Sequence, residues 1–157
     1  MPNVPNFLPI VSSATALKAA AGALKKLKKL KIAKGLGKRK PRNFKAPSGR
    51  NFTVLQRSDI DWDMKRRVKV KGKVKIMTNR DAAKLHGRAP VVKVNGKKQP
   101  ITLHHHNQNP NGPLIEVIQA DHSKHHGALH PKGKSRIDRS EFGTDREAYW
   151  KARGADL

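Results

Sequence analysis

A histidine-rich stretch contains the side chains of this chain that are best suited to catalysis. Residues 98–131 hold seven of the eight histidines. The triplet His104–His106 ends a short apolar run, and His122, His126 and His130 follow at intervals of four residues. Imidazole nitrogens bind divalent metals and titrate near neutral pH. A group of this kind can therefore hold a metal ion and also supply a base.

The spacing of these histidines divides the two roles among them. Three imidazoles hold a metal while leaving coordination positions open for a phosphate oxygen and water. Neighbouring residues on a strand point to opposite faces, so one of His104 and His105 can bind metal while the other acts as a base. His122 and His126 lie one helical turn apart, which suits a shared ion. The residues alone favour a nuclease over a structural zinc module, another metal hydrolase or a protein without metal.

The elements that must position these side chains follow from the hydrophobic pattern. Ile101–His105 and Leu114–Ile118 read as strands, and the turn-rich residues 107–113 join them. The repeated histidines then read as a helix. Upstream, Asn95-Gly96 is a strong hairpin signal that links Val91–Val94 to the first of these strands. The predicted order is strand, loop, strand and helix around one metal ion.

Farther upstream, residues 67–77 alternate apolar and basic side chains, which predicts a strand or a hairpin that bends at Gly72. Such a hairpin would have a core face and a basic face that follows a phosphate backbone, or that only keeps an edge strand soluble. A short helix is predicted over Asp81–His86 and ends at Gly87. The acidic cluster at 59–63 is interpreted as balancing local basic residues rather than as a metal site. The lysines of the expected basic face are Lys69, Lys71, Lys73 and Lys75.

The first 50 residues differ in character from the rest. Residues 1–16 read as an extended lead-in, and residues 17–34 as a basic amphipathic helix. Residues 35–50 are rich in glycine, proline and basic residues, which is typical of a linker. No acidic residue occurs before Asp59. We therefore predict a basic helical extension and linker over 1–50 and a separate domain over 51–157.

The overall charge indicates a polyanionic partner. The chain has 35 Lys+Arg against 11 Asp+Glu, a net charge of +24, which fits nucleic acid or an anionic membrane surface. Hydrophobic content is 36% and aromatic content 4%, so the core should be small. The absence of cysteine excludes disulfides and thiolate metal sites. Nucleic acid is the favoured partner, and membrane contact by residues 17–40 is the less favoured alternative.

The C-terminal segment reads as a basic loop followed by a helix. Lys132 and Lys134 lie in the loop, where they are candidates for phosphate contacts. The pattern Thr144–Glu147 is a capping box, which predicts a helix over Asp145–Arg153. Tyr149 and Trp150 would pack this helix on the core, with base stacking by Trp150 as the less favoured role.

An ordered series of residues from about 59 to 153 resembles the LHH subgroup of the HNH (His-Me finger) nucleases, which occur as C-terminal toxin domains of bacterial polymorphic toxins. The matching residues, in chain order, are Ile60-Asp61-Trp62, Thr78-Asn79, Gly87-Arg88-Ala89-Pro90, Asn95-Gly96, Leu103-His104-His105, Gln108, Gly112-Pro113-Leu114, Glu116, His122, Leu129-His130, Ser135, Ile137-Asp138-Arg139, Phe142 and Tyr149-Trp150. The chain departs from the pattern after His122, where the stretch is short and two histidines are added.

The resemblance, which does not cover residues 1–50, implies a ββα-metal finger as the nuclease core. Together with the small β-hairpin subdomain and the basic N-terminal helical extension read from the residues, the predicted fold class is α+β. The resemblance also implies that His104 is the first metal ligand, His105 the general base that activates water, and His122 the second ligand. The third ligand stays open between His126, which we favour from helical spacing, and His130, which fits the motif. In a continuous helix, residues eight apart lie about 12 Å from each other, so His130 would require a break near Gly127.

Further roles follow from the same resemblance. Arg88 and Arg139 are candidates to neutralise charge in the transition state. Gln108 and Glu116 are candidates to orient the loop and the imidazoles, and ordinary turn and strand hydrogen bonding is an equal alternative for both.

The expected function is a metal-dependent endonuclease that cuts DNA with little sequence specificity, using one divalent ion of Mg, Mn, Ni or Zn. RNA is the alternative substrate, and a non-catalytic zinc-stabilised nucleic-acid-binding module is the rival function. The resemblance further implies an interbacterial toxin that is neutralised by a cognate immunity protein, which should be acidic. Such a toxin would leave the producing bacterium as part of a larger protein or through a secretion system. It would act in the cytoplasm of the target cell.

Overall fold

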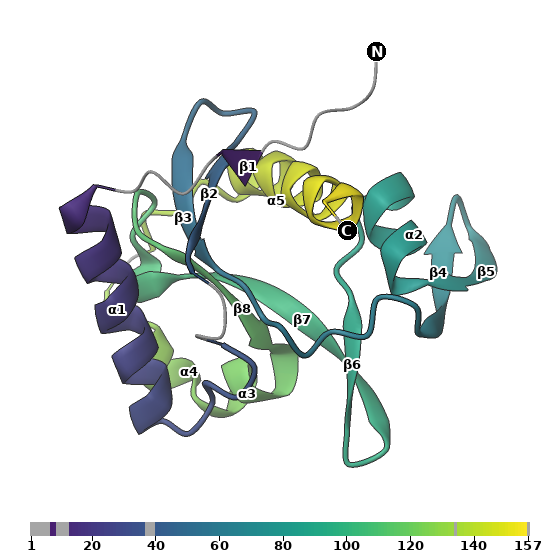
Figure 1. Cartoon of the computed structure of the whole chain (residues 1–157), viewed down its shortest axis with the longest axis horizontal. Helices are drawn as coiled ribbons and strands as arrows, with labels where there is room; N and C mark the ends of the chain where they lie inside the picture. The colour runs from purple at the N-terminus through teal and green to yellow at the C-terminus, as the bar shows by residue number, and fades with distance from the viewer. Residues whose placement is uncertain (1–6, 9–12, 37–39, 134, 157) are drawn as a thin grey trace.

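Strands with alternating apolar residues pair into a mixed six-stranded sheet in a computed structural model of the α+β class. The structure describes residues 7–8, 13–36, 40–133 and 135–156. The strand order is β1-β2-β3-β8-β7-β6, in which β3 and β8 run parallel and the other neighbours run antiparallel. The helices α1 and α5 lie on either side of this curled sheet (Figure 1). The strands are β1 (Phe7–Leu8), β2 (Arg42–Lys45), β3 (Asn51–Leu55), β6 (Val91–Val94), β7 (Lys97–His105) and β8 (Leu114–Ile118).

The three strands β6, β7 and β8 agree with the sequence prediction. Asn95 and Gly96 have φ of 51° and 78°, which are the left-handed values that a two-residue hairpin turn requires. This turn lets the ladder start directly at Lys97, so β7 begins four residues earlier than expected. The strand β8 then pairs with β7 in a register that sets His104 opposite Ile115 and His105 opposite Leu114.

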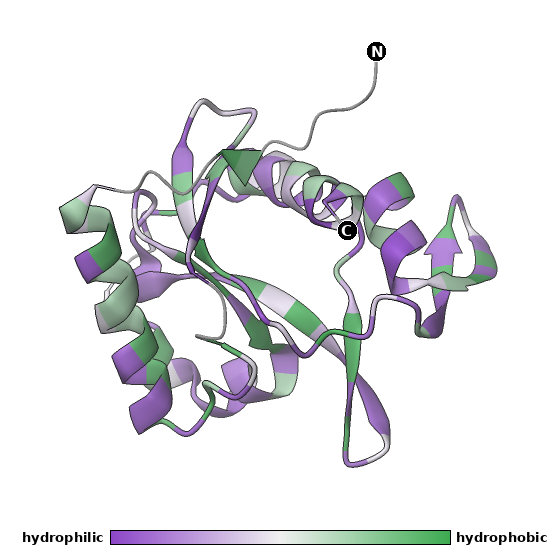
Figure 2. Cartoon of the chain, viewed as in Figure 1, coloured by the Kyte–Doolittle hydropathy of each residue, from purple (hydrophilic) through white to green (hydrophobic). Residues whose placement is uncertain are grey.

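The sheet separates two hydrophobic cores. On one side, α5 (Arg139–Ala155) packs Phe142, Tyr149 and Trp150 against the strands. Trp150 is only 1% exposed, which confirms its packing role. On the other side, α1 (Ala14–Lys29) packs Leu27 and two alanines against residues of β3 and β8. Figure 2 shows hydrophilic residues gathered in the C-terminal half of α1, whose apolar stripe faces the protein.

The N-terminal part is more ordered than the sequence predicted. The helix α1 begins at Ala14 because the Ser13 hydroxyl accepts a hydrogen bond from the Ala16 backbone N–H, and it ends at Lys29. The linker prediction was wrong for Arg42–Lys45, which forms β2 and pairs with both β1 and β3. The division at residue 50 stays a prediction, although β2 and β3 pair across it.

The predicted hairpin exists as a separate two-stranded sheet of β4 (Lys65–Val70) and β5 (Lys73–Thr78). The expectation of one core face and one basic face was wrong. Directly opposed residues share a face, and Lys69 is opposed to Val74 while Lys75 is opposed to Val68. Lys69 therefore lies with the exposed Val74, Lys73 and Lys75 lie on the opposite face, and Lys71 lies in the turn.

The helix α2 (Asn79–His86) follows directly, with Thr78 as its N-cap and the left-handed Gly87 as its C-cap, close to the predicted bounds. The acidic cluster balances charge, as expected: Asp59 pairs with Arg57 at 2.7 Å and Asp63 with Arg80 at 3.1 Å.

The C-terminal helix α5 begins six residues earlier than predicted. The Asp138 carboxylate accepts hydrogen bonds from the backbone N–H groups of Ser140 and Glu141, so it caps the helix. The expected capping box lies inside the helix, where Asp145 instead accepts hydrogen bonds from the backbone and hydroxyl of Ser48. No helix in the described ranges is long and apolar enough to cross a membrane.

Candidate functional site

The strand β7 directs two adjacent histidines to opposite faces of the sheet. His104 lies opposite Ile115, on the side covered by α1, whereas His105 lies opposite Leu114, on the side covered by α5. Both side chains are buried, with 3% and 5% exposure. The two side chains thus point in the opposite directions that alternation along a strand predicted.

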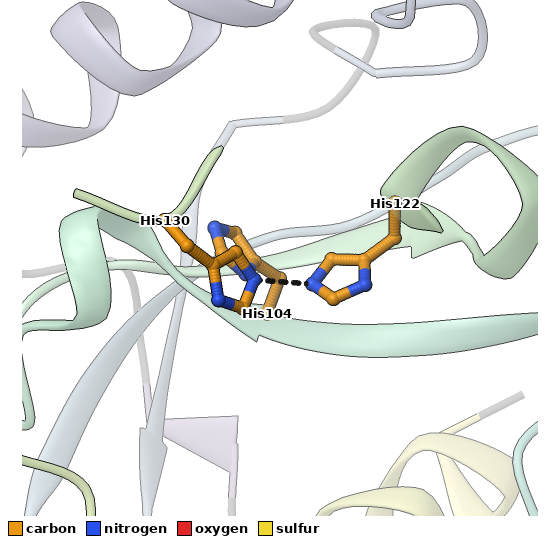
Figure 3. A group of neighbouring side chains, drawn as sticks. All are labelled: His104, His122 and His130. Atoms are coloured by element: carbon orange, nitrogen blue, oxygen red, sulfur yellow. Dashed lines mark hydrogen bonds between the residues drawn. The ribbon is translucent and has the colours of Figure 1, made fainter. Parts of the chain in front are cut away.

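The chain after β8 forms two short helices instead of one. The helix α3 (Gln119–Lys124) ends at His125, whose φ and ψ of −105° and 24° are not helical, and α4 (His126–Leu129) follows. The prediction of a continuous helix was therefore wrong. The break allows Leu129 to enter the core beneath α1. It also turns His130 back, so that its Nε2 lies 2.8 Å from Nε2 of His122 (Figure 3).

The break between α3 and α4 determines which histidine rings lie close together. The ligand nitrogens of His104, His122 and His130 all lie within 4.8 Å of one another, and Figure 3 shows the three rings converging from β7, α3 and the end of α4. The favoured candidate, His126, is exposed and lies outside this group. Its ring stacks on His130 at 4.1 Å and lies 6.2 Å from that of His122. The structure thus brings His130, and not His126, close to His104 and His122, whereas the preference for His126 rested on an unbroken helix.

The three imidazoles fit a divalent metal ion. His104 Nε2 is buried and has no hydrogen-bond partner among the described residues, a state that costs about 1–3 kcal/mol. Burial, followed by neighbouring histidines, lowers the pKa of His104 to about 3 and that of His130 to about 4. Both rings are therefore neutral near pH 7 and have lone pairs to donate. An all-imidazole set suits Zn or Ni, whereas Mg and Mn prefer oxygen ligands.

His105 lies in a different environment from these three residues. Its ring centroid is 4.2 Å from that of Phe142 and 5.9 Å from that of Phe52. Burial, and then the charges of Arg139 and Arg50, lower the pKa of His105 to about 4. The imidazole is therefore neutral at neutral pH and is able to accept a proton.

Of the two candidate arginines, one lies near the histidines. The charge of Arg139 contributes to the lowered pKa of both His105 and His130. Arg88 instead donates a hydrogen bond to the backbone carbonyl of Lys69, in the β4–β5 hairpin. The charge of Arg139, and not that of Arg88, thus acts on two of these histidines.

The two candidate orienting residues make other contacts. Gln108 accepts a hydrogen bond from the Ser135 hydroxyl, which joins the loop after β7 to the segment before α5. Glu116 is fully buried, and none of its described hydrogen bonds goes to an imidazole. Its carboxylate accepts from the Arg57 backbone N–H at 2.7 Å, the Tyr149 hydroxyl at 2.6 Å and Arg153 Nε at 2.8 Å.

The partners of Glu116 were missed by the sequence analysis. In a chain with 35 lysines and arginines, nothing in the local sequence marks Arg57 and Arg153 as buried. Of the lysines proposed to bind phosphate in the C-terminal loop, Lys132 is exposed. Lys134 lies outside the described residues.

Comparison with known protein families gives one match. The family described as "A nuclease of the HNH/ENDO VII superfamily with conserved LHH" matches residues 78–156. The matched segment runs from Thr78, the N-cap of α2, through the histidine group to the end of α5, whereas α1, strands β1 to β4 and the rest of β5 lie before it. Comparisons with curated proteins and with solved structures gave no match.

Proposed function

The chain belongs to the LHH nucleases of the HNH/ENDO VII superfamily, and from this premise we propose that it is a metal-dependent endonuclease that hydrolyses DNA with little sequence specificity. One observation carries the proposal. The family match contains three imidazoles that converge within 4.8 Å and a fourth, His105, that lies on the opposite face of the same strand. In this proposal β7, β8 and the α3–α4 segment form the ββα-metal finger.

His104, His122 and His130 would hold the metal ion. A bound divalent cation polarises a phosphate oxygen and stabilises the leaving oxygen. The strand β7 fixes His104, whereas the break at His125 positions His130, so two independent backbone features set the ligand geometry. A ligand set without carboxylates makes Zn or Ni a better fit than Mg or Mn.

His105 is the proposed general base. Its neutral ring can take a proton from the attacking water, and a nearby phosphate would offset the charge of Arg139 and raise the pKa of His105 towards working pH. Arg139 is the proposed group that stabilises negative charge in the transition state, because its charge acts on both His105 and His130.

The substrate proposal rests on charge. A net charge of +24 attracts a polyanion, and contacts to phosphate carry no base information. Lys69, Lys71, Lys73, Lys75 and Lys132 remain proposed phosphate contacts, from both faces of the hairpin and from the C-terminal loop. The same site would accept RNA, which makes RNA the alternative substrate.

The proposed biological role is that of an interbacterial toxin. It is supported by the resemblance of residues 59–153 to polymorphic-toxin nucleases and by a charge that would bind an acidic immunity protein. The protein would be exported as part of a larger toxin or through a secretion system, and it would act in the cytoplasm of the target cell.

Incubation of supercoiled plasmid with the protein and Mg²⁺, Mn²⁺, Ni²⁺ or Zn²⁺ tests the nuclease proposal, with EDTA as a control and RNA in parallel. We expect metal-dependent nicking. His105→Ala should reduce the rate by about 10²–10⁴-fold, the usual contribution of a positioned base. The matched control His86→Ala removes an imidazole at the end of α2, outside the histidine group, and should cut normally.

A negative result would have a defined meaning. If folded protein binds DNA but cuts neither nucleic acid with any of the four metals, the nuclease proposal is wrong. The non-catalytic zinc-stabilised module would then be the better account, and chelation should unfold the protein.

A further inference from the structure

The lysines of α1 form a charged surface for which the histidine site gives no explanation. α1 contains no acidic residue, and Lys18, Lys25, Lys28 and Lys29 are exposed. Within the described part of the chain, no ion pair involves a lysine of α1. Unpaired like charges on one helix repel one another, so this surface is suited to an anionic ligand.

The position of α1 brings this charge to the histidine site. Ala20, Ala23 and Leu27 are buried in the core that also contains Ile115 and Leu129, on the side of the sheet that His104 faces. Lys26 Nζ donates a hydrogen bond of 3.1 Å to Asn107 Oδ1, in the loop that directly follows the histidine triplet.

The helical spacing divides the lysines into two groups. At 100° per residue, Lys18, Lys25 and Lys29 lie within about 40° of one another, on the outward side opposite Leu27. They recur about 11 Å and 6 Å apart along the helix axis. Lys26 lies on the flank that contacts the loop, and Lys28 lies about 160° away from it, on the other flank.

We propose that Lys18, Lys25, Lys26 and Lys29 form a phosphate-binding surface, the α1 basic surface, which holds nucleic acid beside the histidine site. The choice of nucleic acid rests on the proposed nuclease function. A membrane surface is less suitable, because the apolar stripe that would enter the lipid is already buried against β3 and β8. The α1 basic surface lies outside the matched family segment, which covers residues 78–156.

The test measures binding without cleavage. Affinity of the full chain for a fluorescent DNA duplex is measured by anisotropy in EDTA at several salt concentrations. The triple variant K18Q/K25Q/K29Q should reduce the slope of log K against log [salt] by about 2 to 3, because each lost phosphate contact contributes about 0.9. The control K84Q/K93Q/K97Q removes the same charge from α2, β6 and β7. It should change the slope by less than about 1, because α2 lies far from α1 (Figure 1) and none of the three lysines belongs to the α1 basic surface.

A second pair of variants compares two flanks of the same helix. Lys26→Gln should reduce the salt slope by about 1, whereas Lys28→Gln should change it by clearly less. Gln at position 26 can still donate a hydrogen bond, which favours retention of the loop contact.

The outcomes separate the two proposals. Equal slope changes in the two triple variants, or none in either, would overturn the α1 basic surface even if the plasmid is cut. A slope change confined to K18Q/K25Q/K29Q supports the surface even if no cleavage occurs. If K18Q/K25Q/K29Q loses the binding of the wild-type protein to phosphatidylserine vesicles but binds DNA unchanged, the surface is assigned to membranes and the proposal is overturned.

Discussion

The sheet carries two groups of buried polar side chains, one on each face, and they differ in how completely their hydrogen bonds are made. On the α5 face, the oxygens of Glu116 accept hydrogen bonds from Tyr149, Arg153 and the backbone of Arg57. On the α1 face, His104 Nε2 has no partner among the described residues. The nitrogens of His122 and His130 face each other.

This difference indicates that the Glu116 group stabilises the fold, whereas the histidine group is suited to binding a ligand. The carboxylate of Glu116 is satisfied by the protein itself, so its geometry does not depend on a ligand. Among the described residues, His104 Nε2 makes no hydrogen bond and the Nε2 atoms of His122 and His130 bond each other, so the three imidazoles obtain a common partner only when a cation binds. We therefore expect substitutions in the Glu116 group to act on folding stability, and substitutions in the histidine group to act on metal binding.

The largest expected effect is on stability. Glu116→Gln removes the charge that compensates Arg153, which is 1% exposed, and breaking a buried pair in this way costs about 3–5 kcal/mol. Urea unfolding of metal-free protein measures this loss. The control Glu147→Gln breaks an exposed pair with Lys151 and should cost no more than about 0.5 kcal/mol. A loss below about 1 kcal/mol for Glu116→Gln would show that the Glu116 group does not stabilise the fold in the way that distinguishes it from the histidine group.

The next effect concerns the third metal ligand. Zn²⁺ at 100 times its Kd should stabilise the wild-type protein by about 2.7 kcal/mol. His130→Ala should abolish most of this gain because it removes a ligand from the group. His126→Ala should keep the gain because the exposed His126 lies outside the group. Unfolding with and without metal measures both, and the reverse result would restore His126 as the ligand.

The same contrast explains what the sequence could predict. The bounds of β6 and β8 and the turn at Asn95-Gly96 were predictable because they depend on local signals, namely short apolar runs and a turn that requires positive φ. The opposite directions of His104 and His105 follow from strand geometry alone.

The rest depends on contacts between distant residues. The break at His125 accompanies the burial of Leu129 beneath α1, and helical spacing within the segment gives no sign of it. In β2, two of the four residues are basic and only Phe44 is buried, so the sequence has no strand pattern there. The strand is identified only by its pairing with β1 and β3. The buried arginines of the Glu116 group are identified only by their partner.

The smallest expected effect tests whether a single hydrogen bond of the Glu116 group contributes to folding stability alone. Tyr149→Phe keeps the ring that packs edge-on against Phe44 but removes the hydroxyl that donates to Glu116 and accepts from Gln56. Because that hydrogen bond goes to a charged group, the loss should be about 1.5 kcal/mol. The control Thr144→Val deletes an exposed hydroxyl of the same helix and should change stability by no more than about 0.5 kcal/mol.

Metal-free urea unfolding measures both variants, and zinc titration then measures their metal affinity. If Tyr149→Phe lowers stability while its zinc affinity equals that of the wild-type protein, the Glu116 group and the three metal-binding histidines are independent. A matching fall in zinc affinity would mean that the Glu116 group also sets the histidine geometry across β7 and β8, and that the division between support and function is wrong.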